Sequence, residues 1–130
     1  MINNKIPEIK EKDLLTEKII ACAYKVHSEI GPGFSEKIYH NALKIAFEET
    51  GLNCNSEKQY KVFYRGRQIG FLKIDLLVEG KVIVEIKAIT GDSPKVFEAQ
   101  LLSYLKIAKI NVGLLVNFGN KSCWVRRLMV

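Results

Sequence analysis

Cysteine is scarce in this chain, and its spacing does not suit a structural role. The 130 residues include three cysteines, Cys22, Cys54 and Cys123, which lie far apart and form no C-x-x-C pair. An odd number of widely spaced cysteines fits neither a disulfide framework nor a zinc site. We therefore expect a fold that is held without disulfides or zinc.

Long apolar runs are also missing. No stretch approaches the ~20 apolar residues of a membrane-spanning helix, and the opening residues MINNKIPEIKEKD lack the apolar centre of a secretory signal. These absences predict a cytoplasmic protein that has no membrane partner. Repeats, low-complexity segments and linkers are absent too, so residues 1–130 are expected to form a single domain, with residues 1–12 as a flexible lead-in.

Acidic residues are outnumbered. There are 14 acidic against 20 basic residues, which gives a net charge of +6 and a pI near 9.2. Such a surface raises the local concentration of polyanions. However, Lys5, Lys10, Lys12, Lys18 and Lys25 are spread out rather than gathered in one tight cluster. Charge alone therefore permits a nucleic-acid partner and does not establish one.

Helical periodicity dominates the first fifty residues. A first helix is expected from its cap at Asp13 to the GPG stop at residues 31–33. A second is expected from its cap at Ser35 through about Thr50, with Gly51 as its stop. The apolar side chains expected to face inward on this second helix are Ile38, Ala42, Leu43, Ala46 and Phe47.

Strand patterns follow. Alternating stretches predict strands at residues 58–64, 67–78 and 81–89, separated by Gly66 and Gly80. Because they follow one another closely, they are expected to pair as an antiparallel meander.

A third helix and two strands complete the pattern. Ser93, with Pro94 at the first helical position, opens a helix over residues 94–109. Strands are expected at residues 112–118 and 122–130. The sequence therefore predicts an α/β (α+β) fold with the order α-β-β-β-α-β, one extra N-terminal helix, one extra C-terminal strand and a mixed central sheet.

Two charges interrupt the apolar stretch KVIVEIKAI. Glu85 and Lys87 share one face of this strand with Ile83 and Ile89, because strand side chains alternate. Burying an unpaired charge costs several kcal/mol or more. Taken alone, the pattern is better explained by a solvated face, or by Glu85 and Lys87 pairing with each other.

Asp75 interrupts the preceding strand. An odd-length loop places Asp75 beside Glu85 and Lys87, whereas a two-residue turn at Glu79 and Gly80 turns it away. The odd loop is favoured, because Glu-Gly lacks the Asn or Asp preferred first in a tight type I′ turn. Two neighbouring carboxylates repel and need a cation or a shared proton. Oxygen ligands without nearby His or Cys suit Mg²⁺ or Mn²⁺.

These residues resemble a nuclease signature. Asp75, Glu85 and Lys87 form a D-x9-E-x-K arrangement on the expected α-β-β-β-α-β order, which is similar to the PD-(D/E)XK nuclease superfamily. Ile74 stands where the signature has proline. The resemblance spans roughly Leu14 to the C-terminus and implies a restriction-endonuclease-like core.

Two further motifs support the resemblance. Gly33, Glu36 and Tyr39 match the G-x-x-E-x-x-Y motif of the small GxxExxY proteins, a branch of that superfamily. Gln100 and Tyr104 fit the Q-x-x-x-Y motif of exonuclease-like members.

The resemblance also implies roles for single residues. Asp75 and Glu85 would be metal ligands, with the backbone carbonyl of Ile86 as a third, and Glu36 would extend the site directly or through water. Lys87 would orient or help to deprotonate the attacking water and offset charge that develops on the phosphate.

Residues outside the acidic centre complete the expected site. Gln100 and Tyr104, four apart on one helix face, would hold the site or contact a phosphate, although core packing explains Tyr104 equally well. Arg65 and Arg67 lie in an aromatic and basic hairpin that is expected, from its composition, to touch a strand of DNA.

The expected function is that of a nuclease that uses Mg²⁺ or Mn²⁺, in which a metal-activated water attacks a phosphate in line. The alternative is a catalytically silent nucleic-acid-binding or scaffold module on the same fold. The expected partner is nucleic acid; DNA is expected ahead of RNA, although the sequence does not decide between them. Endonuclease and exonuclease activity are not distinguished, and a homodimer is left open.

Overall fold

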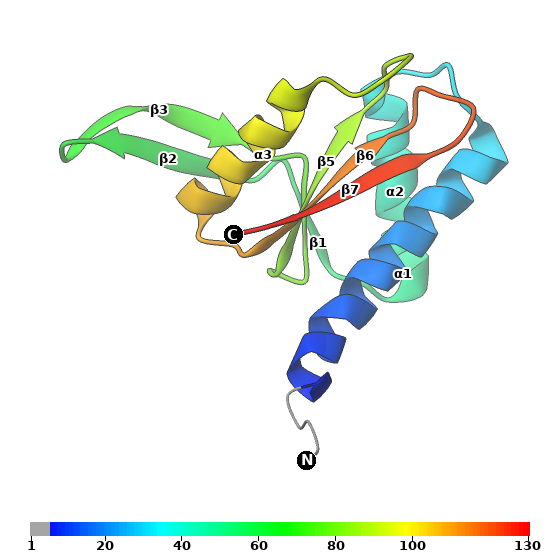
Figure 1. The fold of residues 1–130 in the computed structure, drawn as a ribbon, viewed down its shortest axis with the longest axis horizontal. Helices are drawn as coiled ribbons and strands as arrows, with labels where there is room; N and C mark the ends of the chain where they lie inside the picture. Colours follow the sequence, from blue (N-terminus) through cyan, green and yellow to red (C-terminus); the bar gives the residue numbers. More distant parts are fainter. Residues whose placement is uncertain (1–5) are drawn as a thin grey trace.

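The computed structural model describes residues 6–130, with side chains described from residue 14 onward. Helices cover both faces of a central sheet, and a two-stranded hairpin extends away from it (Figure 1). The elements of this described part are α1 (Ile6–Ile30), α2 (Glu36–Thr50), β1 (Cys54–Ser56), β2 (Gln59–Tyr64), β3 (Arg67–Lys73), β4 (Leu76–Val78), β5 (Val82–Lys87), α3 (Lys95–Ala108), β6 (Val112–Asn117) and β7 (Trp124–Met129).

The central sheet is mixed, as expected. Its strand order is β1-β4-β5-β6-β7, in which β5 and β6 run parallel and the other neighbours run antiparallel. One apolar cluster joins α1 and α2 to one face of the sheet, and a second joins α3 and the hairpin to the other. Successive β5 side chains alternate between these clusters, since Val82, Val84 and Ile86 belong to the first and Ile83 belongs to the second.

Helix α1 begins earlier than the sequence predicted. It starts at Ile6, so the expected start at Asp13 was wrong, and residues 6–12 of the expected lead-in belong to the helix. Pro7 is compatible with this start, because proline is tolerated in the first turn of a helix. Residues 1–5 lie outside the described part of the chain. Within residues 6–130, no helix combines the length and apolarity needed to cross a bilayer.

Helix α2 confirms most of its predicted features. Gly51 ends it in the left-handed conformation, with φ of 81°, and Leu43 and Phe47 are fully buried. Two details were wrong. Ile38 is 45% exposed, and the Ser35 side chain makes no cap hydrogen bond. The Ser35 carbonyl instead accepts the first backbone N–H bonds of the helix.

Helix α3 makes the parallel crossover from β5 to β6. Pro94 occupies the N-cap rather than the first helical position, and the Ser93 hydroxyl, expected to open the helix, is buried without a hydrogen-bond partner. Gly113 on β6 lets the helix approach closely. A Cβ atom there would lie 3.0 Å from the Leu101 side chain.

The expected three-strand meander is split between two sheets. Strands β2 and β3 pair only with each other, and the expected strand over residues 67–78 breaks at Ile74 and Asp75. The short strand β1, which the sequence did not predict, pairs with β4 instead. The physical cause is a bend at the base of the hairpin, where Glu57 has φ of 57° and its N–H donates to the Asp75 carbonyl at 2.9 Å.

Candidate functional site

The loop between β4 and β5 has the odd length that the sequence predicted. The register pairs Leu76 with Val84, which leaves three residues, 79–81, in the turn. Glu79 and Gly80 both have positive φ, 55° and 65°, and the Lys81 N–H donates to the Val78 carbonyl at 3.0 Å, as in a type I′ turn that is followed by one extra residue. The odd length is therefore as predicted, whereas the expectation that Glu-Gly avoids this turn was wrong. Continuing this register by one residue places Asp75 directly opposite Glu85.

Asp75 and Glu85, the acidic pair, are joined by two crossed hydrogen bonds. The backbone N–H of Asp75 donates to Glu85 Oε2 at 2.8 Å, and the backbone N–H of Ile86 donates to Asp75 Oδ2 at 2.7 Å. Each carboxylate thus accepts an N–H from the strand that carries the other. The two acidic groups converge where the expected long strand breaks.

Burial and a neighbouring like charge together make Glu85 a weaker acid than a free carboxyl group. Glu85 is 5% exposed, and its pKa is raised to about 8, first by burial and then by the neighbouring Asp75 carboxylate. The Asp75 N–H and the Lys87 charge lower the pKa of Glu85, and the Glu36 carboxylate raises it. No described lysine, arginine or histidine forms an ion pair with either carboxylate. Such a pair holds a proton or takes up a cation.

Lys87 lies at the edge of the acidic pair. Its ammonium nitrogen is 4.3 Å from the centre of the Phe97 ring on α3, and its charge still reaches Glu85. A cation over an aromatic face gains about 0.5–2 kcal/mol, which limits the positions that the ammonium adopts. Phe97 therefore helps to set the direction of Lys87.

Glu36 lies exposed in the first turn of α2, and its charge reaches Glu85. Among the described residues, no group of three or more His, Cys, Asp or Glu side chains forms a ready metal site. The two carboxylates of the acidic pair suit a hard divalent cation, since one is buried and neither forms an ion pair with a described basic side chain. Ile86 presents its N–H to Asp75, and its carbonyl stays a predicted ligand.

Tyr104 lies near the acidic pair, and Gln100 is less closely tied to it. The pKa of the half-buried Tyr104 phenol is raised, first by burial and then by the charges of Glu85 and Asp75. Its ring also packs in the α3 cluster, so the packing role that the sequence left open is present. Gln100, one turn earlier, is exposed and makes no hydrogen bond to the pair in the described part.

The two predicted hairpin arginines lie away from the acidic pair. Arg65 lies in the turn between β2 and β3, and Arg67 begins β3, so both are at the tip of the hairpin (Figure 1). The Arg65 guanidinium lies 5.3 Å from the centre of the Tyr64 ring. Any contact of these arginines with a substrate would therefore occur at a distance from the carboxylates.

Sequence reasoning did not include His40 in the site. This side chain is buried, and its Nε2 lies 2.8 Å from the Ser56 hydroxyl on β1. Burial lowers the pKa of His40, while the charges of Asp75 and Glu57 oppose that shift. One signal was available, because Glu36 and His40 are four apart and share a helix face.

Tyr39 explains the structural part of the G-x-x-E-x-x-Y pattern. Its hydroxyl donates to the Gly31 carbonyl at 2.6 Å, and its ring stacks on Phe118 at 4.4 Å between centroids. Gly33 has φ of 102°, which favours glycine. These contacts fix the start of α2, and with it the position of Glu36.

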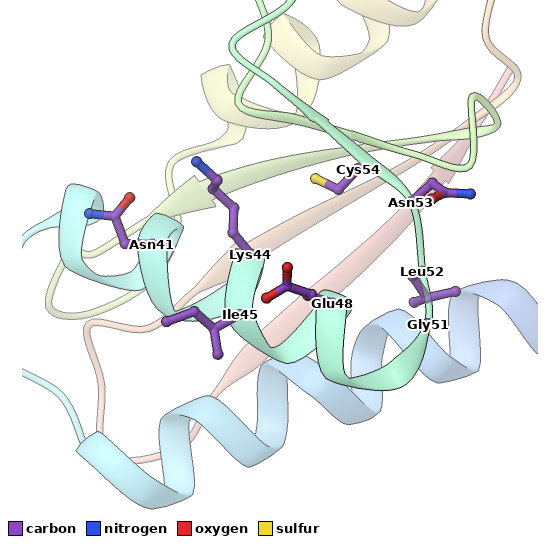
Figure 2. Close-up of a pocket in the computed structure, with 8 residues that line it drawn as sticks. All are labelled: Asn41, Lys44, Ile45, Glu48, Gly51, Leu52, Asn53 and Cys54. Atoms are coloured by element: carbon purple, nitrogen blue, oxygen red, sulfur yellow. The ribbon is translucent and has the colours of Figure 1, made fainter.

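An open pocket of about 600 Å³ lies between α2 and the segment that leads into β1 (Figure 2). None of the predicted site residues lines it, so it is separate from the acidic pair. Burial raises the pKa of the Cys54 thiol at its rim, which disfavours the reactive thiolate. Its lining residues are Asn41, Lys44, Ile45, Glu48, Gly51, Leu52, Asn53 and Cys54.

Comparisons with known proteins agree with the fold. The family model of the PD-(D/E)XK nuclease superfamily matches residues 13–128. A solved structure titled "Crystal structure of SSO0001" is similar to this chain with a TM-score of 0.58 at 17% identity, which shows a shared fold. The match covers 93% of this chain and 60% of that one. No curated protein matches the sequence significantly.

Proposed function

We propose that this chain, which belongs to the PD-(D/E)XK nuclease superfamily and has its restriction-endonuclease-like fold, is a metal-dependent nuclease that hydrolyses phosphodiester bonds in DNA or RNA. The acidic pair carries the proposal. Asp75 and Glu85 are held side by side by crossed hydrogen bonds, and Glu85 is buried. A scaffold gains nothing from two like charges of which one is buried, because the pair destabilises the fold until it binds a proton or a cation.

Nucleases of this superfamily generally use divalent metals. The Asp75 and Glu85 carboxylates would hold Mg²⁺ or Mn²⁺, with the Ile86 carbonyl as a further ligand and Glu36 acting directly or through water. A metal at this place supplies an acidified water and a Lewis acid for the phosphate.

Lys87 is the residue that we assign to the reacting phosphate. Its ammonium lies close enough to affect Glu85 and is held over Phe97. A fixed positive charge beside the acidic pair would orient the water and offset negative charge that develops in the transition state. We assign Tyr104 and Gln100 on α3 to positioning the site or the substrate.

We also place the chain in the GxxExxY branch of the superfamily. The support comes from the start of α2, where Tyr39 bonds the Gly31 carbonyl and Gly33 takes a positive φ. In this arrangement the glycine and the tyrosine of the motif stabilise the same turn. Both set the turn from which Glu36 projects.

A second candidate is a nucleic-acid-binding module that does not cleave. One observation favours it, namely that no third acidic, histidine or cysteine side chain joins the acidic pair in the described residues. In that case the pair would keep a proton at neutral pH, as the raised pKa of Glu85 allows.

Cleavage assays with matched variants separate the two candidates. Single- and double-stranded DNA and RNA are incubated with Mg²⁺ or Mn²⁺ and wild type, Asp75→Ala, Glu85→Ala, or the exposed control Glu49→Ala. We expect cleavage by wild type and Glu49→Ala alone. Cleavage that survives in both site variants would reveal a contaminant and sink the assignment.

Metal binding gives a readout that does not depend on activity. Electron paramagnetic resonance of free Mn²⁺ should show uptake by the wild type and by Glu49→Ala, with weaker uptake after Glu85→Ala. Absence of both uptake and cleavage in the wild type would favour the binding module.

A further inference from the structure

The hairpin β2–β3 contains most of the net charge of the chain. Between Lys58 and Ile74 there are five basic residues and no acidic residue. The remaining 15 basic and 14 acidic residues nearly cancel. The excess positive charge is therefore a property of this hairpin rather than of the whole surface. The five basic residues are Lys58, Lys61, Arg65, Arg67 and Lys73.

One face of the hairpin is packed, and the opposite face presents large apolar side chains. Tyr60 and Leu72 pack against the α3 cluster. On the opposite side, Phe63, Ile69 and Phe71, the outer face, are 57%, 66% and 63% exposed. These three side chains share a face because Lys61 pairs with Phe71 and side chains alternate along each strand. Apolar groups this exposed, with a basic surround, mark an interaction surface.

The base of the hairpin is attached to the acidic pair. The Asp75 carbonyl accepts the Glu57 N–H at 2.9 Å, and the Ile74 N–H donates to the Lys58 carbonyl at 3.1 Å. Strand β3 therefore runs directly into Asp75, while its other end reaches past α3 (Figure 1). A chain molecule lying along the hairpin would have one end at the carboxylates.

We propose that hairpin β2–β3 is a binding platform for single-stranded nucleic acid, on which the outer face stacks unpaired bases while the basic side chains contact phosphates. This inference rests on the proposed nuclease function and names its substrate class. Unpaired bases stack on exposed aromatic rings, whereas bases in a duplex stack on each other and show only their edges. The basic side chains of the hairpin match the phosphates of a nucleic acid, and the apolar outer face matches the flat faces of its unpaired bases.

The Tyr64–Arg65 contact extends the platform to the tip. The Arg65 guanidinium lies over the Tyr64 ring. Both groups are flat, and bases stack on flat groups of this kind.

Binding in EDTA tests the platform without cleavage. Fluorescein-labelled oligo-dT and oligo-U of about 20 nucleotides, longer than one typical binding site, are compared by anisotropy with a duplex of equal length. We expect both single strands to bind at least tenfold more tightly than the duplex. Comparison of the two single strands separates DNA from RNA.

Aromatic variants test the stacking itself. Phe63→Ala and Phe71→Ala should each weaken single-strand binding roughly fivefold or more and leave duplex binding unchanged. Phe71→Tyr should retain most of the affinity, because the ring remains. The control is Tyr24→Ala on α1, which removes a ring that is 50% exposed and should have no effect. Circular dichroism verifies that each variant is folded.

Arginine variants test the phosphate contacts. Arg65→Gln and Arg67→Gln should each reduce the slope of log affinity against log salt by about 0.7, the value for one lost contact to a single strand. Lys25→Gln, an exposed charge on α1, should leave the slope unchanged.

Several outcomes overturn the platform. One is equal affinity for duplex and single strand, and another is unchanged affinity in both phenylalanine variants. A third is a shift from dimer to monomer in those variants with unchanged oligonucleotide affinity, which would identify a second copy of the chain as the occupant. Single-strand binding that needs the outer face, without cleavage in any metal, would overturn the nuclease proposal and leave the platform standing.

Discussion

The acidic pair and the hairpin that emerges from it are neighbours along the chain, yet they place charge in opposite ways. At the acidic pair, one carboxylate is buried beside another and has no positive ion-pair partner among the described residues. On the hairpin, only positive charges occur, and large apolar side chains are exposed beside them. Neither the buried carboxylate nor the basic hairpin with its exposed apolar side chains stabilises the fold by itself. Each makes sense once a partner is bound, a cation in one case and a polyanion in the other.

The largest effect is expected from removing charge at the acidic pair while keeping its hydrogen bonds. Asp75→Asn and Glu85→Gln retain oxygen acceptors for the crossed bonds but lose the charge that attracts a metal. We expect cleavage to fall by at least about a hundredfold, in line with the loss of a group that acts on developing charge. Initial rates on a single-stranded oligonucleotide in Mn²⁺ measure this, and near-wild-type rates in both variants would contradict the acidic pair as the site.

The second prediction concerns stability against pH in EDTA. The pKa of Glu85 is raised from 4.5 to about 8, so the folded state keeps a proton that the unfolded state releases between these values. Stability of the wild type should therefore fall as pH rises from about 5 to 8. Glu85→Gln removes this loss, and at pH 8 it should be more stable than wild type, by up to a few kcal/mol. At pH 4 the difference should vanish. Urea denaturation of both proteins at pH 4 and at pH 8 measures this difference in stability. A difference that does not change with pH would exclude ionisation of Glu85 as its cause.

The third prediction adds a metal to the same comparison. At pH 8, millimolar Mg²⁺ or Mn²⁺ should raise the Tm of the wild type, because a ligand that binds only the folded state stabilises it. A tenfold excess over Kd corresponds to about 1.4 kcal/mol. Glu85→Gln should show a smaller shift. Differential scanning calorimetry decides the point, and equal shifts in both proteins would place the metal elsewhere.

The fourth prediction weakens the link between Lys87 and α3. Phe97→Leu keeps an apolar side chain but removes the aromatic face under the ammonium. We expect a rate loss of about three- to tenfold, equivalent to about 0.7–1.4 kcal/mol of cation–π attraction. Lys87→Met should lose more, since it removes the charge itself. Equal rates in wild type and Phe97→Leu would show that Phe97 does not position the ammonium.

The smallest effect is expected on the hairpin. Phe71→Ser removes a side chain that is 63% exposed, so the free energy of unfolding should change by no more than about 0.5 kcal/mol. Leu72→Ser, the adjacent residue that packs against α3, is the matched control and should cost more. Urea denaturation compares them, and similar losses would mean that the outer face is part of the core.

The odd length of the β4–β5 loop was predicted correctly, but not for the right reason. Glu79 and Gly80 both take the positive φ of a type I′ turn, which Glu-Gly was expected to avoid, and Lys81 supplies the extra residue that sets which strand residues face each other. The break at Ile74 was not predictable, because the alternation of FLKIDLLV continues through it without interruption.

Other features depend on partners that are distant in sequence. The three-residue strand β1 has no alternating pattern of its own and exists because β4 pairs with it. His40 is buried because Ser56, 16 residues later, lies against it. The roles of Glu36, Lys87 and Gln100 stay predictions, since each role is a contact to a metal, a water or a substrate.

The crossed hydrogen bonds have a bearing on how this fold tolerates change. At the strand break, the carboxylate oxygens take the place of backbone carbonyls and close the ladder between β4 and β5. An amide oxygen serves that purpose as well as a carboxylate does. The fold therefore needs only a hydrogen-bond acceptor at Asp75 and at Glu85. The negative charge of the two side chains is not needed for the fold. In related chains, Asn or Gln at these two positions would mark a protein that keeps the crossed hydrogen bonds but has lost the charge needed for metal binding and cleavage.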